Sequence, residues 1–280
     1  MAGIAVEALP NEVPPQVGIT ITGLDPGAPS TIRVDVSWDG VTWTSVRGAL
    51  SLTVTGDVFL RDHVPPLNVQ AAYRLTVLAG TTIPDTLSAS TLVPSSTMWV
   101  QNPLSPHDAF PVVIGALPSD GRVGLLDPAL GSASWQQHTD TAVPEGASLP
   151  VASVSTRLRA ADVVLTLGYI QSVHDGTVRN LLMSTGPVVI RGLPVRYLLD
   201  DVAHVVLGDL TETRLDYGNR QITTWALTAR SVRASAQAIA VPWWTYQAVV
   251  ALWAPSTYDQ VKAARPGATY LDWQRDPRVP

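Results

Sequence analysis

Hydrophobic and polar residues alternate with a period of two through the first third of the chain. Each alternating segment has one apolar face and one face of Thr, Ser, Arg or Asp side chains. This alternation is typical of β-strands that are covered on one side only. The predicted strands span residues 17–22, 32–38, 41–46, 50–55 and 72–77.

Turn residues separate these strands, and Asp39-Gly40 is a strong signal for a two-residue hairpin. Short strands with frequent turns predict a β-sandwich of the immunoglobulin or fibronectin type III kind over residues 16–93. Residues 1–15 are expected to form an N-terminal extension. The aromatic residues expected in the core or on a sheet face of this region are Trp38, Trp43 and Tyr73.

A different pattern begins at residue 94. Residues 94–146 contain one short apolar run, 110–114, among many Gly, Pro, Ser and Asp residues. Such turn-forming residues break regular periodicity. The sequence therefore predicts an ordered connector that contains one strand or two.

Residues 147–236 form a second β-rich region, in which one segment changes period. Within residues 177–184 the apolar positions Val178, Leu181 and Leu182 follow helical spacing, with Thr177 as the predicted N-cap. One helix among several strands predicts an α+β barrel or curled sheet whose opening the helix covers. The strands predicted after the helix span residues 187–191, 197–199, 204–207, 211–215 and 221–228.

The C-terminal residues 237–280 contain a repeat. The dipeptide Thr-Tyr recurs with a period of 12 residues at Tyr246, Tyr258 and Tyr270, and an apolar residue follows four positions after each Thr. Each unit fits a short helix, and Pro residues between the units stop the helices. Because such short helices are marginal alone, we expect an arm of short helices that packs on something larger. The fold class predicted for the whole chain is mainly β.

Composition and charge narrow the function classes. The chain has 280 residues, no Cys and a net charge of −5, and Lys262 is its single lysine. The absence of Cys excludes disulfides and thiolate metal sites, and the acidic balance disfavours nucleic-acid binding. The sequence shows neither a secretory signal nor an apolar run that could span a membrane, so we expect a soluble protein made in the cytoplasm.

No constellation of catalytic residues emerges from the sequence. The five histidines are widely separated, and Asp200-Asp201 is expected to be a solvated turn rather than an acid–base pair. The sequence contains no nucleophile elbow, phosphate-binding loop or dinucleotide fingerprint. We therefore expect no enzyme activity, no cofactor and no metal site.

Aromatic side chains are the strongest candidates for an interface, since Trp and Tyr anchor protein–protein contacts. The densest aromatic cluster is Trp243-Trp244 with Tyr246, which has only Arg233 as a nearby cation. Docking to protein explains this cluster better than carbohydrate stacking, which stays an open alternative. The candidate interface residues are Trp99, Trp243, Trp244, Tyr246, Tyr258, Tyr270 and Trp273.

Three parts of the chain carry a resemblance to a known family. They are the segment 37–48, which holds two Trp residues, with the proline-bearing segment 99–106, the run from 149–151 through 181–191 to 205–209 and 225–230, and the Thr-Tyr repeat. Within that run a helix exit and Gly-Pro precede a strand that ends in Arg. Together they resemble the minor tail proteins of long-tailed, siphovirus-type bacteriophages of actinobacteria, a group that includes the distal tail protein.

The resemblance implies a structural virion component at the tail tip. It implies a ring, homohexameric in this family, that joins the tail tube protein to the tail-tip hub protein and that can also meet the tape measure protein. Residues 147–236 are the expected ring-forming domain. The resemblance implies neither nucleic-acid binding nor membrane insertion. The alternative is a carbohydrate-binding tail protein that recognises the host cell envelope.

Overall fold

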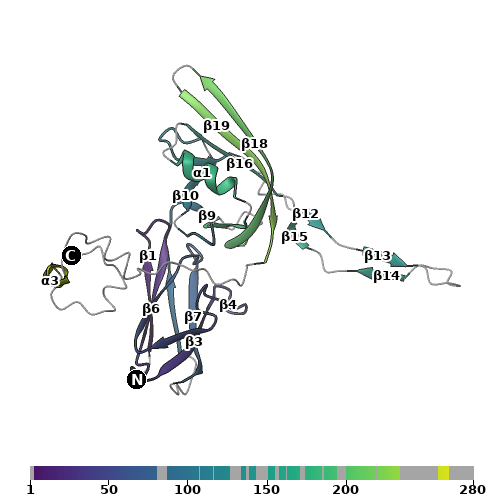
Figure 1. Ribbon diagram of the computed structural model, residues 1–280. Coiled ribbons are helices and arrows are strands. Elements are labelled where there is room, and N and C mark those ends of the chain that lie inside the picture. The colour runs from purple at the N-terminus through teal and green to yellow at the C-terminus, as the bar shows by residue number, and fades with distance from the viewer. Residues whose placement is uncertain are drawn as a thin grey trace. The chain divides into compact units, whose positions relative to one another are not determined.

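The chain is mainly β, and its strands form a closed barrel and several smaller sheets (Figure 1). It divides into two compact units, which we call the N-terminal unit, formed mainly by residues up to Ser95, and the barrel unit, formed mainly by residues from Ser96 to Ala234. The computed structural model describes residues 3–80, 87–106, 108–115, 117–126, 134–136, 139–142, 151–154, 158–161, 163–170, 174–184, 186–193, 200–217, 220–233 and 258–264.

The N-terminal unit contains two antiparallel sheets. One has the strand order β1-β2-β6, and the other has the order β4-β3-β7-β8 with β5 paired to β3. The strands are β1 (Gly3–Leu9), β2 (Gln16–Thr22), β3 (Pro29–Ser37), β4 (Thr44–Ser45), β5 (Leu52–Thr55), β6 (Val58–Asp62), β7 (Gln70–Ala79) and β8 (Leu87–Leu92).

The alternation seen in the sequence becomes burial on one face of each sheet. In the middle of β3 and β7 alternate apolar positions are buried, and Ile32, Val34 and Tyr73 are fully inaccessible to solvent, whereas Leu78 near the end of β7 is 49% exposed. In the first sheet Val17, Ile19 and Ile21 are buried in the same way. Removal of these apolar surfaces from water stabilises the unit.

Two predictions for this unit need correction. Residues 3–9 are strand β1, paired with β2 from Gly3↔Thr22 to Leu9↔Gln16, and not an extension outside the sheets. Asp39-Gly40 does not form a two-residue hairpin, because the connection from β3 to β4 runs from Trp38 to Trp43. Gly40 adopts a φ of 72°, so the expected glycine conformation is present in a longer turn.

The barrel closes through seven strands in the order β10-β11-β16-β19-β18-β17-β9. Strands β10 and β11 are parallel, and the other neighbours are antiparallel. The strands are β9 (Met98–Gln101), β10 (Ala109–Ile114), β11 (Val123–Leu125), β16 (Val163–Ile170), β17 (Val188–Arg191), β18 (Val202–Tyr217) and β19 (Arg220–Ser231).

The barrel begins earlier than the sequence predicted. Strands β9, β10 and β11 lie within residues 94–146, which the sequence pattern assigned to a connector with one strand or two. These strands are short and separated by turn residues, so each offers too few positions for a visible period. Long-range pairing, such as Ile190↔Val100 between β17 and β9, makes them part of the barrel.

A second predicted boundary, which lies inside strand β18, is also wrong. The sequence predicted separate strands at residues 204–207 and 211–215, but both belong to one long strand. The register shifts between Leu207 and Leu210, opposite β19, as in a β-bulge. Gly208 and Asp209 therefore form a bulge and not a turn.

Helix α1 (Asp175–Leu182) packs against the barrel, as Figure 1 shows. Val178, Leu181 and Leu182 are buried, which confirms the predicted helical face. The predicted N-cap is wrong, because the helix begins at Asp175 and His174 is the N-cap, with no side-chain cap hydrogen bond. An acidic residue in the first turn favours this earlier start through the helix dipole.

Two short ribbons and a further helix complete the described residues. The ribbons pair β12 (Ser134–Gln136) with β15 (Leu158–Ala161) and β13 (Thr139–Ala142) with β14 (Val151–Val154). Helix α3 (Tyr258–Ala264) falls on the second Thr-Tyr unit of the predicted C-terminal arm. The predictions for residues 237–257 and 265–280, and for the strand at 197–199, lie outside the described residues.

Candidate functional site

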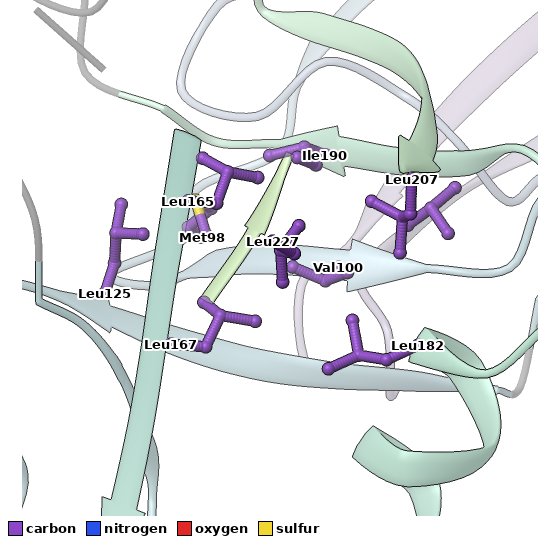
Figure 2. Close-up of a pocket in the computed structure, with 10 residues that line it drawn as sticks. Met98, Val100, Leu125, Leu165, Leu167, Leu182, Ile190, Leu207 and Leu227 are labelled. Carbon is purple, nitrogen blue, oxygen red and sulfur yellow. The ribbon is translucent and has the colours of Figure 1, made fainter. Parts of the chain in front are cut away.

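The interior of the barrel is a packed apolar core. Side chains from β9, β11, β16, β17, β18, β19 and α1 converge there, and the space left between them is about 10 Å³, roughly enough for one water molecule. Figure 2 shows Val100, Leu167, Leu182, Leu207 and Leu227 pointing toward this space. The barrel interior is therefore a source of stability, and it has no room for an organic ligand.

A polar cluster joins α1 to the end of this core. The Tyr169 hydroxyl donates to the carboxylate of Asp175, and Trp225 Nε1 donates to the Tyr169 hydroxyl at 3.3 Å. Burial, together with the hydrogen bond to Asp175, raises the pKa of Tyr169. Trp225 is fully buried, so the cluster holds a large aromatic ring at the junction of helix and barrel.

A charged cluster lies on the same side of the junction. Arg179 of α1 donates to both carboxylate oxygens of Glu212 at 2.6 and 3.1 Å, and Arg214 Nε donates to Glu212 at 2.7 Å. Desolvation works against the charged form of Glu212, but the hydrogen bonds from Arg179 and Arg214 outweigh it and lower the pKa. The Arg179 guanidinium also lies 5.4 Å from the centre of the Trp225 ring. These contacts tie α1 to β18 and β19.

The N-terminal unit has its own charged cluster, centred on the buried carboxylate of Asp35. Arg33, Arg74 and Ser45 donate to this carboxylate at 3.0, 3.1 and 2.7 Å. The Arg74 guanidinium lies 4.2 Å from the centre of the Trp43 ring. Trp43 lies in the connection before β4, and its ring packs against the guanidinium of a β7 residue.

The Asp39 carboxylate closes the turn between β3 and β4. It accepts hydrogen bonds from the backbone N–H groups of Val41 and Thr42 at 2.8 and 2.7 Å and from the Ser37 hydroxyl at 3.0 Å. The hydrogen bonds from Thr42 and then Val41 hold the pKa of Asp39 far below its usual range. These contacts are those of a turn-forming residue.

The predicted site residues lie in different places. Trp99 is buried in β9, with 7% of its surface exposed, so the folded chain itself covers this predicted interface residue. Tyr258 is the first residue of α3. The remaining predicted interface residues, Trp243, Trp244, Tyr246, Tyr270 and Trp273, lie outside the described residues.

The sequence predicted a solvated turn at Asp200-Asp201 and no metal site. Asp201 lies in a bend before β18, where burial and the neighbouring Asp200 raise its pKa. Among the described residues, no three His, Asp or Glu side chains come together as a potential metal-binding group.

The outer face of the β18–β19 hairpin carries a group of uncharged side chains. Cross-strand pairing places Thr211 beside Ala226, Thr213 beside Thr224, and Leu215 beside Ile222. All six side chains are at least partly exposed, and Leu215 is 53% exposed. We call these six residues the neutral face. Large exposed apolar patches mark contact surfaces, and this patch combines three apolar residues, Leu215, Ile222 and Ala226, with three Thr residues.

The neutral face borders an unpaired strand edge. Strand β17 pairs with β18 only over Val202–Val205, whereas β19 pairs with β18 as far as Tyr217. From residue 206 to 217, no strand in the described part of the chain pairs with the other side of β18. We call this stretch the open edge. Its backbone groups form a template for another strand.

Sequence reasoning missed the open edge because it divided β18 at Gly208-Asp209. The signal that was overlooked is the alternation of uncharged and charged residues from Thr211 to Asp216. It continues the strand pattern in a shifted phase. A bulge changes phase without ending the strand, so such a shift fits one strand as well as two, and only the pairing with β19 decides between them.

Comparison with protein-family models, curated proteins and solved structures gives no match for this chain. Among the described residues, no helix has both the length and the apolar character needed to cross a membrane.

Proposed function

We propose that this chain is a structural component of a phage tail, placed in a ring between the tail tube and the tail-tip hub. The observation that carries the proposal is the neutral face beside the open edge of β18. Together they offer an uncharged surface beside backbone groups that pair with no strand in the described part of the chain, which suits permanent contact with another protein. A packed barrel closed by a helix supplies a rigid support for that surface.

The N-terminal unit fits the proposal as a fibronectin III or immunoglobulin-like sandwich. If β1, β2, β3, β6, β7 and β8 are taken as strands A, B, C, E, F and G, the two sheets pair as A-B-E and C-F-G, the pairings of this fold. The Tyr73 hydroxyl donates to Asp62 Oδ2 at 2.9 Å, which ties β7 to the end of β6. A tyrosine near the start of strand F makes a comparable contact in such sandwiches.

A ring requires heterologous contacts that close, so each copy must present two different surfaces. The barrel unit contains the neutral face and the open edge, and we assign ring formation to it. The family resemblance points to six copies. The ends of the ring would meet the tail tube protein on one side and the hub protein on the other.

The experiment combines mass measurement with particle analysis. We expect native mass spectrometry of the purified chain to show a closed oligomer and negative-stain images to show rings. We expect protein sequencing of purified virions to find the chain, and antibodies against it to label the tail tip. A monomer that is absent from virions would contradict the proposal. Specific binding to host-envelope glycans without incorporation would favour the carbohydrate-binding alternative.

A further inference from the structure

We infer that the open edge of β18 pairs with the β13–β14 ribbon of a second copy of this chain. The contact adds the ribbon to the barrel sheet through backbone hydrogen bonds, which is the mode called β-augmentation. This inference depends on the proposed function for its role in a tail ring. The pairing itself is a property of the purified chain and is tested separately.

The direction in which the backbone groups of the open edge point follows from a hydrogen bond elsewhere in the barrel. Leu126 N–H donates to the carbonyl of Thr166 at 2.8 Å, so the backbone groups of Thr166 point away from β19. Successive residues of a strand direct their backbone groups to opposite sides. The backbone groups of Leu167 therefore point toward β19, where the partner of Leu167 is Trp225.

The same alternation applies on β19 and β18. Thr224 is next to Trp225, so its backbone groups point toward β18, where the partner of Thr224 is Thr213. The backbone groups of Glu212 and Arg214 then point away from β19. The open edge therefore presents N–H and C=O groups at alternate residues, from Leu210 through Glu212 and Arg214, in the spacing that an incoming strand needs.

The ribbon supplies a strand in need of a partner. In the described part of the chain, β13 pairs only with β14, from Thr139↔Val154 to Ala142↔Val151. A two-stranded ribbon is marginally stable in water, because it lacks the additional strands that a hydrophobic face requires. Addition to a third strand would stabilise it.

Charge permits this pairing. Asp140 is the only charged residue in the two ribbon strands, and the outward side chains of the open edge are Thr211, Thr213 and Leu215. A register that places Asp140 on the outward face brings no charged side chain of the open edge beside it. The Glu212 and Arg214 side chains point to the opposite face, where they bond to each other and, through Glu212, to Arg179.

Symmetry favours the ribbon over a second open edge as the partner. If two open edges paired with each other, the contact would be isologous and would stop at a dimer, leaving both ribbons unpaired. When a ribbon pairs with an edge, each copy uses both elements once. This contact is heterologous and can close into a ring.

Engineered cysteines test the contact, because the natural chain contains no Cys. One full-length variant carries Thr213→Cys at the edge, and a set of others carries a single Cys at Thr139, Thr141, Ala152 or Val154. We expect mixing under mild oxidation to yield a disulfide between the edge variant and at least one ribbon variant. Thr224→Cys, one strand inside the edge, is the matched control and should link at least tenfold less.

Exclusive linkage of Thr213→Cys to itself would overturn the inference in favour of edge-to-edge dimers. The absence of any linkage, at concentrations where the chain is oligomeric, would also overturn it. Neither result would decide whether the chain belongs to a tail, since particle incorporation tests that proposal.

A proline variant tests the backbone groups directly. Arg214→Pro removes an N–H group from the open edge, whereas Arg214→Ala removes the same side chain and keeps that group. We expect Arg214→Pro to weaken self-association roughly tenfold, the effect of a lost backbone hydrogen bond with its partner left unpaired. Arg214→Ala should associate like the natural chain, and circular dichroism should show both variants folded.

Asp216→Pro with Asp216→Ala provides a second pair, in case proline at position 214 prevents folding. Asp216 has the same strand parity as Arg214, so its N–H group also points to the open edge. Equal association of the proline and alanine variants in both pairs would contradict the inference.

Discussion

At the scale of single residues, polar side chains in this protein mainly anchor one element to another. Glu212 shows this most clearly, because it accepts two hydrogen bonds from Arg179 of α1 and one from Arg214 of its own strand. A bidentate arginine–carboxylate pair is stronger and more specific in geometry than a single contact. The barrel and its helix are therefore joined by charge as well as by apolar packing.

This anchor predicts a dependence of stability on pH. Because the pKa of Glu212 is lowered in the folded state, its stabilisation is complete above the unfolded pKa of about 4.3 and is lost as pH falls through the folded value. We expect Glu212→Gln to lower the free energy of unfolding by about 1 kcal/mol at pH 7. The difference should be smaller at pH 3 than at pH 7, as measured by urea denaturation. A difference that is equal at both pH values would contradict the role of this charge.

At the scale of elements, α1 completes the barrel. Its buried face contributes Val178, Leu181 and Leu182 to the same core as the strands. An eight-residue helix is marginal by itself, so this packing supplies most of its stability. Two substitutions separate the effects of packing and of helix propensity.

Truncation of the buried face should be costly. Leu181 is 1% exposed, so we expect Leu181→Ala to lower the free energy of unfolding by about 2–5 kcal/mol through lost contacts and a cavity. Met183, which is 55% exposed, provides the control, since Met183→Ala should change the free energy of unfolding by less than about 0.5 kcal/mol. Thermal and urea unfolding followed by circular dichroism measure both. Equal effects would show that α1 does not close the core.

Gly176 tests helix propensity without a change of packing. It lies in the first turn of α1, and an added Cβ there meets no atom within 4 Å. We expect Gly176→Ala to stabilise the chain by roughly 0.5 kcal/mol, because alanine loses less backbone entropy than glycine. Gly80→Ala provides the contrast and should destabilise the chain, because Gly80 has a φ of 100° and a Cβ there meets the backbone carbonyl oxygen of Pro29 at 2.7 Å.

At the scale of the whole molecule, the surface that we propose for self-association is neutral rather than charged. The neutral face and the open edge offer apolar groups and backbone hydrogen bonds, which salt screens little. We expect self-association, measured by analytical ultracentrifugation, to change less than about threefold between 50 and 500 mM NaCl. A steep loss of association with salt would assign the contact to charged side chains instead, for example to the Arg33–Asp35–Arg74 cluster.

The amino-acid sequence by itself determined the mainly β character, several strand positions and the apolar face of α1. These depend on local periodicity, because alternation or helical spacing already decides which side chains share a face. The strand over residues 17–22 and the burial of Val178 and Leu181 follow directly from such patterns.

Only the tertiary structure decided which strands form the barrel and where its edge stays open. Strands β9 and β17 are buried on both faces and lie far apart in sequence, and their partnership, including Arg191 Nε donating to Gln101 Oε1 at 3.1 Å, has no local signal. The open edge arises because β17 is short and β18 is long, so pairing ends at Val205 while β18 continues. Strand pairing is a long-range choice made by packing and hydrogen bonding together, and local patterns carry no information about it.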